Sequence, residues 1–221
     1  MKAMILSAGR GERMRPLTDK VPKALVPVSG KPLIEYHLAA LAAVGIRDVV
    51  INLAWLGGEI RSALGDGSRF GVNINYSDEG AAALETGGGI VRALALLGPE
   101  PFWVINGDVL TDYPFTDTGL AAEDQGRLIL VSNPAHNPAG DFGISAGRLV
   151  NESAQQFTYS GIGLFRPEMF AAEKQGIYPL APLLRRLADQ DALAAELYAG
   201  SWLDVGTPER LQQAEAAIAA S

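Results

Sequence analysis

The sequence predicts an α/β fold of three layers, Rossmann-like, with a mostly parallel central sheet and a small additional β lobe. Over residues 1–132, short apolar runs alternate with longer amphipathic stretches, a rhythm typical of strand–helix–strand units around a buried sheet. A glycine-rich segment directly follows the first apolar run. After Ser132 the runs become shorter, and we expect them to form the extra lobe. A chain of 221 residues fits one such domain.

The apolar runs of the first part are too short for helices, and most are bounded by glycine, proline or polar residues. We therefore predict strands at residues 3–6, 49–52, 72–76, 102–106 and 128–132. In an open α/β sheet, ligands bind beyond the carboxyl ends of the strands. The residues that follow each run are thus the first candidates for a functional site.

The stretches between these strands carry apolar residues at helical spacing, which predicts helices at 32–44, 56–64 and 89–97. Pro32 suits a first helical position and Gly45 suits a helix stop. Glu85 and Thr86 open the third helix through three glycines. The amide groups there would either face a phosphate or sugar hydroxyl, or be satisfied by a plain N-terminal cap.

The second part predicts a loop at 133–140, rich in proline and asparagine, and short strands at 142–144, 148–150 and 157–165. A helix at 182–189, a strand at 202–204 and a closing helix at 208–220 follow. The chain contains no internal repeat. We expect a single domain, 1–221, made of a first part (about 1–132), a lobe (about 133–200) and a closing strand and helix (201–221).

Composition excludes several classes of function. The chain has no cysteine, so it forms no disulfide, zinc–thiolate site or iron–sulfur cluster. Its net charge is −7, with 18 basic and 25 acidic residues, which disfavours binding to nucleic acid or to an anionic membrane surface. No apolar run approaches the length of a membrane span. We expect a cytoplasmic protein, a monomer or small homo-oligomer, whose partners are small molecules.

The segment after the first strand, residues 7–18, has the composition of a phosphate-binding loop. Gly9 and Gly11 let the backbone approach a phosphate closely and point successive N–H groups at it. Met14 stands where a dinucleotide-binding motif has its third glycine, and Pro16 prevents an immediate helix. A Rossmann dehydrogenase is therefore disfavoured.

Cations are concentrated in the same strand-to-helix connection, which is longer than such connections usually are. On an acidic protein this concentration favours phosphate contact by Arg13 and by Lys23, the two basic residues that we assign to catalysis. Arg10 and Arg15 have a simpler alternative as solvated surface charges, and we expect that alternative for at least one of them.

Two aspartates follow apolar runs. Asp108 ends the segment 102–108 and Asp204 ends the run that begins at Trp202. Mg²⁺ prefers one or two protein carboxylates, with phosphate oxygens and waters completing its octahedron. Taken alone, each aspartate has helix capping or a turn as an alternative role. Together with the phosphate loop, the pair predicts an Mg²⁺ site.

These segments occur in the order found in a known family. Residues 6–18, the pair Pro22-Lys23, and residues 85–89, 106–108 and 202–207 resemble the motifs of sugar-phosphate nucleotidylyltransferases over nearly the whole chain. Among its branches, the chain is most similar to the bacterial enzymes acting on N-acetylmuramic acid 1-phosphate. That likeness rests on residues 77–80, 84–89, 106–109, 133–142, 159–162 and 202–210. It implies the nucleotidyltransferase version of the fold, UTP and the sugar phosphate as substrates, and a role in cell-wall sugar recycling.

The resemblance also implies roles for individual residues. Asp108 and Asp204 would hold Mg²⁺, and Arg13 and Lys23 would neutralise phosphate charge. The nucleotide would be bound by Ala8, Gly9, Gly11, Glu12, Arg13, Lys23, Glu79, Gly80 and Gly88. The sugar phosphate would be bound by Glu85, Asn106, Gly140, Asp141 and Glu152. In the lobe the chain differs from many relatives, because no lysine follows Glu152 where they have a Glu-Lys pair.

Other functions remain open at this level. The same chemistry on another base or acceptor would make the protein a hexose or heptose 1-phosphate guanylyltransferase, or a phosphocholine cytidylyltransferase. A non-catalytic sensor of nucleotide sugars would keep the fold without needing the full set of Asp108, Asp204, Arg13 and Lys23. Pyrophosphate release separates these alternatives.

Overall fold

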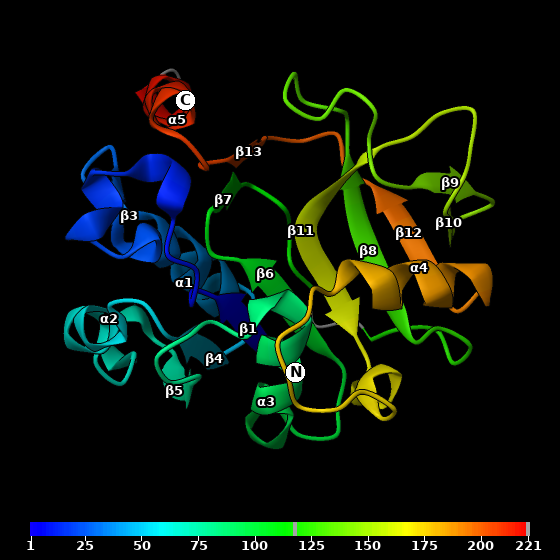
Figure 1. Cartoon of the computed structure of the whole chain (residues 1–221), viewed down its shortest axis with the longest axis horizontal. Coiled ribbons are helices and arrows are strands. Elements are labelled where there is room, and N and C mark those ends of the chain that lie inside the picture. Colours follow the sequence, from blue (N-terminus) through cyan, green and yellow to red (C-terminus); the bar gives the residue numbers. More distant parts are fainter. Residues whose placement is uncertain (117–118, 220–221) are drawn as a thin grey trace.

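A computed structural model describes residues 1–116 and 119–219 (Figure 1). Its centre is a nine-stranded sheet in the order β5-β4-β1-β6-β11-β8-β12-β10-β9. The strands are β1 (Lys2–Leu6), β4 (Asp48–Leu53), β5 (Asn73–Asp78), β6 (Phe102–Asn106), β8 (Gly126–Val131), β9 (Gly143–Ser145), β10 (Arg148–Val150), β11 (Thr158–Phe165) and β12 (Leu193–Leu197). The three-layer, Rossmann-like prediction is thereby confirmed.

The four strands of the first part, β5, β4, β1 and β6, are all parallel to one another. β11 then pairs antiparallel to β6 and to β8, and β12 pairs parallel to β8. β10 and β9 complete the edge in antiparallel pairing. The strands predicted for the extra lobe therefore extend the central sheet. Small two-stranded sheets lie outside it, β2 (Pro27–Val28) with β3 (Lys31–Pro32), and β7 (Val109–Thr111) with β13 (Trp202–Asp204).

Successive residues of each strand point to opposite faces of the sheet, and both faces carry apolar side chains. Helices cover both faces and bury these side chains. On one face, Ala3 and Ile5 of β1 pack with residues of α1 (Leu33–Ala43) and α2 (Gly57–Leu64). On the other, Met4 packs with α3 (Glu85–Leu97) and α4 (Ala181–Asp189). Figure 1 shows α4 in front of β8 and β12.

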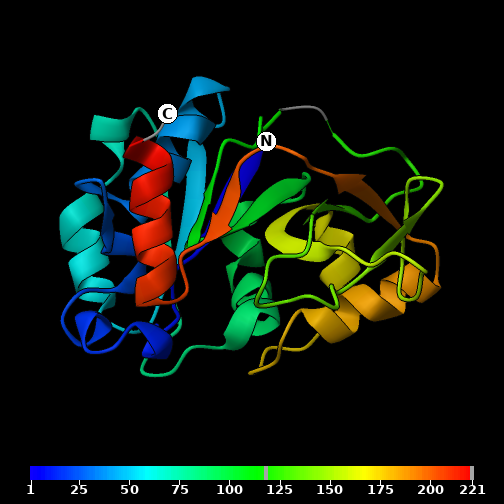
Figure 2. The same ribbon diagram turned by 90° about the horizontal axis from the view of Figure 1, so that it is seen from above.

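The closing helix α5 (Pro208–Ala219) makes a third, smaller core with the phosphate-loop region. Met14, Val26, Leu33 and Val205 are buried there together with Ala214 of α5. Figure 2 shows α5, in red, alongside the blue N-terminal segments. The C-terminal segment thus packs beside the first loop of the chain, which brings residues near 204–210 to the same site as residues 9–23.

Most predicted elements are present with bounds shifted by one or two residues. α3 begins at Glu85, before the predicted 89–97. β12 was not predicted, and β7 was also missed. Residue 220, the predicted end of the closing helix, lies outside the described residues. Among the described helices, none has both the length and the apolarity that a membrane crossing requires.

Candidate active site

A cavity of about 470 Å³ opens at the carboxyl ends of β1 and β6. Its wall combines the loop after β1, the turn after β6 and the start of α3. Predicted site residues that line it are Ala8, Gly9, Gly11, Glu12, Arg13, Lys23, Glu85, Asn106 and Asp108. The residues predicted at the nucleotide phosphates, the first carboxylate and two of the predicted sugar contacts are therefore assembled around one space.

The phosphate loop is held by contacts that leave its outer side open. Gly11 has a φ of 67°, a conformation that favours glycine, and a Cβ there would also make a tight contact of 3.0 Å with Thr18 Cγ2. Thr18 Oγ1 donates a hydrogen bond to the Gly11 carbonyl at 2.8 Å. At the loop's start, the Ser7 amide donates to Asn52 Oδ1 at 2.6 Å. The loop is thus pre-shaped before any ligand arrives.

The three arginines of the loop have different surroundings. Arg10 stacks on Trp55, with its guanidinium carbon 4.3 Å from the ring centroid, and Arg15 forms an exposed ion pair with Asp19 at 2.8 Å. Arg13 lines the cavity, and no hydrogen bond or ion pair joins it to any described residue. Arg13 is therefore the arginine of this loop whose charge is available to a ligand.

The first carboxylate, Asp108, lies in the tight turn between β6 and β7. Gly107 allows this turn, since a Cβ there would lie 2.7 Å from the Leu6 carbonyl oxygen. Lys23 Nζ forms a short ion pair with Asp108 Oδ2. Asp108 therefore stands beside a cation that comes from the phosphate loop.

The second carboxylate, Asp204, ends β13. Arg210 Nη1 donates to its Oδ1 at 2.6 Å, and His136 Nε2 lies 3.5 Å from the same oxygen. Burial raises the pKa of Asp204, while the positive charge of Arg210 acts against that rise. The charge of Asp108 also contributes to raising this pKa.

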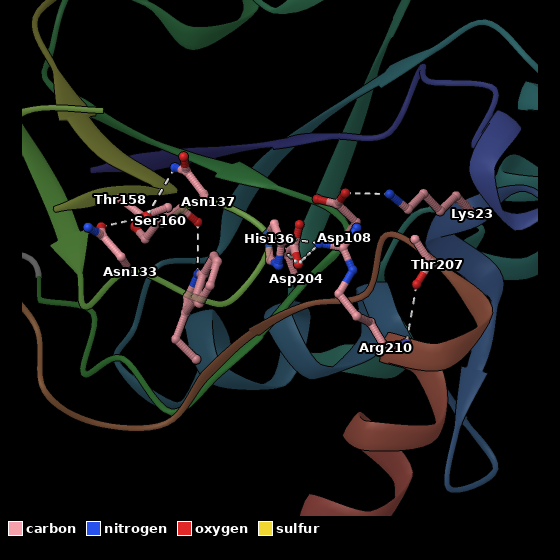
Figure 3. A network of polar contacts seen from close by, with 11 residues as sticks. Lys23, Asp108, Asn133, His136, Asn137, Thr158, Ser160, Asp204, Thr207 and Arg210 are labelled. Carbon is pink, nitrogen blue, oxygen red and sulfur yellow. Dashed lines mark hydrogen bonds and ion pairs between the residues drawn. The ribbon is translucent and has the colours of Figure 1, made fainter. Parts of the chain in front are cut away.

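The backbone fixes the two aspartates as neighbours (Figure 3). β7 and β13 pair antiparallel with Asp204 opposite Val109, and the Val205 amide donates to the Asp108 carbonyl at 2.7 Å. Each carboxylate has one oxygen bonded to a cation, Oδ2 of Asp108 and Oδ1 of Asp204. No described residue bonds the other oxygen of either one.

These oxygens suit a hard cation. Hard, oxygen-seeking Mg²⁺ takes few protein carboxylates and fills its remaining positions with phosphate and water oxygens. The described residues contain no cluster of three or more His, Cys, Asp or Glu side chains that could enclose a metal by themselves. Asp108 and Asp204 therefore fit a metal that arrives with a phosphate-bearing ligand.

Glu79, predicted to bind the nucleotide, does not line the cavity. Its carboxylate is buried and accepts hydrogen bonds from Asn52 Nδ2 at 2.7 Å and from the Leu84 amide at 2.6 Å. Asn52 in turn accepts from the Ser7 amide. Glu79 thus supports the phosphate loop through Asn52, while the neighbouring Gly80 is exposed with a φ of 84°.

The glycine run at the start of α3 serves close packing. The amides of Gly87 and Gly88 both donate to the Tyr178 carbonyl, at 3.1 and 3.2 Å. A Cβ on Gly88 would lie 2.0 Å from the Gly176 carbonyl oxygen, and one on Gly89 would lie 2.5 Å from Glu79 Oε1. No side chain caps the start of this helix, and Glu85 and Thr86 line the cavity, so a contact of their amides with a ligand stays a prediction. Gly88 does not line the cavity.

The predicted sugar contacts of the lobe lie apart from the cavity. Asp141 Oδ2 accepts from the Tyr159 amide at 2.8 Å, and Gly140 packs against Asn133 and Gln156 with a φ of 71°. Glu152 is exposed, and no hydrogen bond or ion pair joins it to a described residue. Nearer to Asp204, a second cavity of about 540 Å³ is lined by Trp202, Asp204 and the loop bearing His136, and it shares Arg13 with the first.

Several residues that line the two cavities were not among the predicted site residues, including Asn52, His136, Gly206 and Arg210. Asn52 ends a predicted strand, which is a usable signal. Arg210 lies within the 202–210 motif, but nothing in the motif indicates that its side chain turns back to Asp204. His136 had only a proline-rich loop around it.

Comparisons with known proteins agree with this geometry. The family model described as nucleotidyl transferase matches residues 2–221. An N-acetylmuramate alpha-1-phosphate uridylyltransferase of Neisseria meningitidis serogroup B is 52% identical over 98% of this chain and 97% of its own length. A protein of the same name from Caulobacter vibrioides is 37% identical over 98% of this chain and 96% of its own length.

A solved structure from Bacillus anthracis, assigned as a glucose-1-phosphate thymidylyltransferase, has the same fold. It superposes with a TM-score of 0.86 over 98% of this chain and 94% of its own, at 24% identity. Family model, full-length relatives and site geometry all lead to one assignment. The chain belongs to the nucleotidyl transferase family.

Proposed function

We propose that the protein transfers UMP from UTP to N-acetylmuramic acid α-1-phosphate in the cytoplasm, giving UDP-N-acetylmuramic acid and pyrophosphate for cell-wall sugar recycling. The observation that carries this proposal is the 52% identity with a uridylyltransferase of that name over nearly the whole of both chains. The base and the acceptor are inferred from the relatives, and the chemistry is inferred from the site.

The reaction needs no general base. A phosphate monoester has a second pKa near 6, so the acceptor is mostly a dianion at neutral pH. One of its oxygens forms the new bond to the α-phosphorus of UTP. The bond from that phosphorus to the bridging oxygen breaks, and pyrophosphate leaves with the electron pair. The nucleophile carries no proton that must be removed.

The chain's own task is to bring two anions together and to stabilise the charge that develops on pyrophosphate. The open backbone at Gly9 and Gly11 binds phosphate through amide groups. Arg13, free of partners among the described residues, and Lys23 supply positive charge from opposite parts of the same loop. A bound phosphate competes for Lys23, so we expect its ion pair with Asp108 to open when UTP binds.

Asp108 and Asp204 would hold Mg²⁺ through their uncommitted oxygens. When bound, the metal supplies Lewis-acid stabilisation of phosphate charge and orients the reacting groups. The protein's contribution is to keep these two carboxylates adjacent and fixed in direction. Backbone pairing of β7 with β13 provides the adjacency.

Pyrophosphate release over a panel of four nucleoside triphosphates crossed with several sugar 1-phosphates tests the proposal. We expect the highest kcat/KM for UTP with N-acetylmuramic acid 1-phosphate, and no release when divalent cations are chelated. Preference for GTP or CTP, or for a hexose or heptose phosphate, would replace the assigned substrates. Absence of release with every pair would make the protein a binder of nucleotide sugars.

A further inference from the structure

Arg210 is a buried arginine that none of the motifs assigns to the reaction. It lies in the first turns of α5, and its side chain is 10% exposed. Its Nη1 donates to Asp204 Oδ1 at 2.6 Å and lies 2.9 Å from His136 Nε2 (Figure 3). Because a guanidinium only donates, the second contact is a hydrogen bond when Nε2 of His136 carries no proton. Helix α5 and the 133–140 loop therefore meet at one carboxylate oxygen.

The local backbone is shaped around this guanidinium. A Cβ on Gly206 would lie 2.2 Å from Arg210 Nη2, so only glycine leaves room for the arginine to fold back onto β13. The amide of Arg210 donates to Thr207 Oγ1 at 3.3 Å, which anchors the first turn of the helix. Val205 and Ala214, before and after it in the sequence, are fully buried. The arginine is thus fixed from several sides, whereas a surface arginine would be free to change rotamer.

The contact leaves the other oxygen of Asp204 uncommitted among the described residues. A carboxylate held through one oxygen by a planar, fixed donor cannot rotate freely about its terminal bond, and its second oxygen then has a defined direction. Outer partners of this kind orient metal ligands in many proteins, and removing them weakens metal binding about 10–100-fold.

We propose that Arg210 is a positioning residue: it fixes Asp204 through Oδ1 so that Oδ2 is presented to the divalent cation, with His136 joining the 133–140 loop to the same contact. This inference rests on the proposed function, since it deepens the account of that site. In this proposal Arg210 touches neither the substrate nor the metal. It acts only by holding Asp204. His136 has the smaller part, because its side chain is 41% exposed.

The test is a titration of Mn²⁺, monitored by electron paramagnetic resonance, into the protein saturated with UTP and without acceptor. For Arg210→Met we expect the dissociation constant of bound Mn²⁺ to rise about 10–100-fold, as for lost outer partners of metal ligands. Arg210→Lys should recover part of the loss, because a lysine restores the charge but not the planar donor. In steady-state assays, the Mg²⁺ concentration for half-maximal rate should rise in parallel, with kcat largely regained at saturating Mg²⁺.

Arg186→Met is the matched control. It removes an arginine that also pairs with a carboxylate, Glu173, on the surface of α4 away from both cavities, and it should bind Mn²⁺ like the wild type. His136→Ala, on an exposed loop, provides a second variant should Arg210→Met unfold, and we expect a smaller loss of Mn²⁺ affinity from it.

A folded Arg210→Met protein with unchanged or tighter Mn²⁺ binding would overturn the inference. So would a lowered melting temperature in both Arg210 variants with wild-type metal affinity in the folded fraction, which a purely structural role produces. These results differ from a failure of the proposed function, in which the wild type releases no pyrophosphate from UTP with the muramic acid phosphate.

Discussion

Asp108 and Asp204 are neighbours in space, yet they are held in different ways. Asp108 follows a buried strand of the main sheet and is paired with Lys23, a flexible side chain from the phosphate loop. Asp204 ends a short strand outside that sheet and is paired with Arg210, whose planar head is enclosed by Gly206 and His136. One partner belongs to the loop that receives the nucleotide, and the other to the helix that closes the chain.

The difference indicates two kinds of support within one metal site. A lysine is a compact point charge on a mobile stem, so Lys23 can leave Asp108 for an incoming phosphate. An arginine held on several sides stays where it is, so Arg210 is a permanent support for Asp204. We infer that the first carboxylate is released by substrate and that the second is oriented in advance.

Replacing either aspartate by asparagine tests the metal-binding role that we propose for both. If both hold one cation, Asp108→Asn and Asp204→Asn should each lower kcat/KM by roughly 10³-fold or more, because such a metal is worth several kcal/mol in the transition state. Circular dichroism and thermal melting should show intact folds. Near-normal turnover in one of the two variants would show that its aspartate does not hold the metal.

Lys23→Ala tests the difference between the two cationic partners, Lys23 of Asp108 and Arg210 of Asp204. We expect a loss of about 10²–10³-fold in kcat/KM for UTP, the size of effect seen when one electrostatic donor to a transition state is removed. The Mg²⁺ requirement should change little, in contrast to Arg210→Met. Initial rates over a grid of UTP and Mg²⁺ concentrations separate the two effects. A loss of twofold or less would return Lys23 to the status of a surface residue.

One histidine near Asp108 makes the stability of the fold depend on pH. His37 of α1 is buried near Asp108, and burial lowers its pKa to about 4, with the Asp108 charge acting against the shift. Between pH 6.5 and 4 the unfolded chain therefore binds a proton that the folded chain does not. Stability is retained above pH 6.5 and falls with acidification.

From pH 7 to pH 5 this histidine should reduce the free energy of unfolding by roughly 2 kcal/mol. Urea titrations of the wild type and of His37→Leu at pH 7 and pH 5 measure this change in the free energy of unfolding. The leucine protein should lose less stability over the same interval, and an identical pH dependence would exclude His37 as the source.

The site residues predicted from the sequence lie where a strand ends or a loop tightens. Asp108, Asp204, Arg13 and Lys23 carry local signals, namely an apolar run before a carboxylate and cations beside glycines. The fold class followed from the alternation of strands and helices. These features depend on neighbours in the sequence, and the structure places the four side chains in and around adjoining cavities.

What escaped prediction depends on contacts between distant segments. β12 has an alanine-rich sequence with no strand propensity, and it is a strand because it pairs with β8. The glycines of α3 leave room for Gly176, Tyr178 and Glu79, which approach them closely. None of these three residues belongs to α3. Arg210 reaches Asp204 only because α5 docks on the phosphate-loop region. Periodicity contains no information about such docking.

The most direct test of a single shared cation is a crystal of the protein with UTP and MnCl₂, measured for anomalous scattering of manganese. The account predicts a Mn²⁺ peak bonded to one oxygen of Asp108 and to Oδ2 of Asp204, as for a hard cation that takes oxygen ligands. In that structure Lys23 should have turned to phosphate while Arg210 still holds Oδ1 of Asp204. A peak bonded to neither aspartate, or to one with the other turned away, would contradict the account.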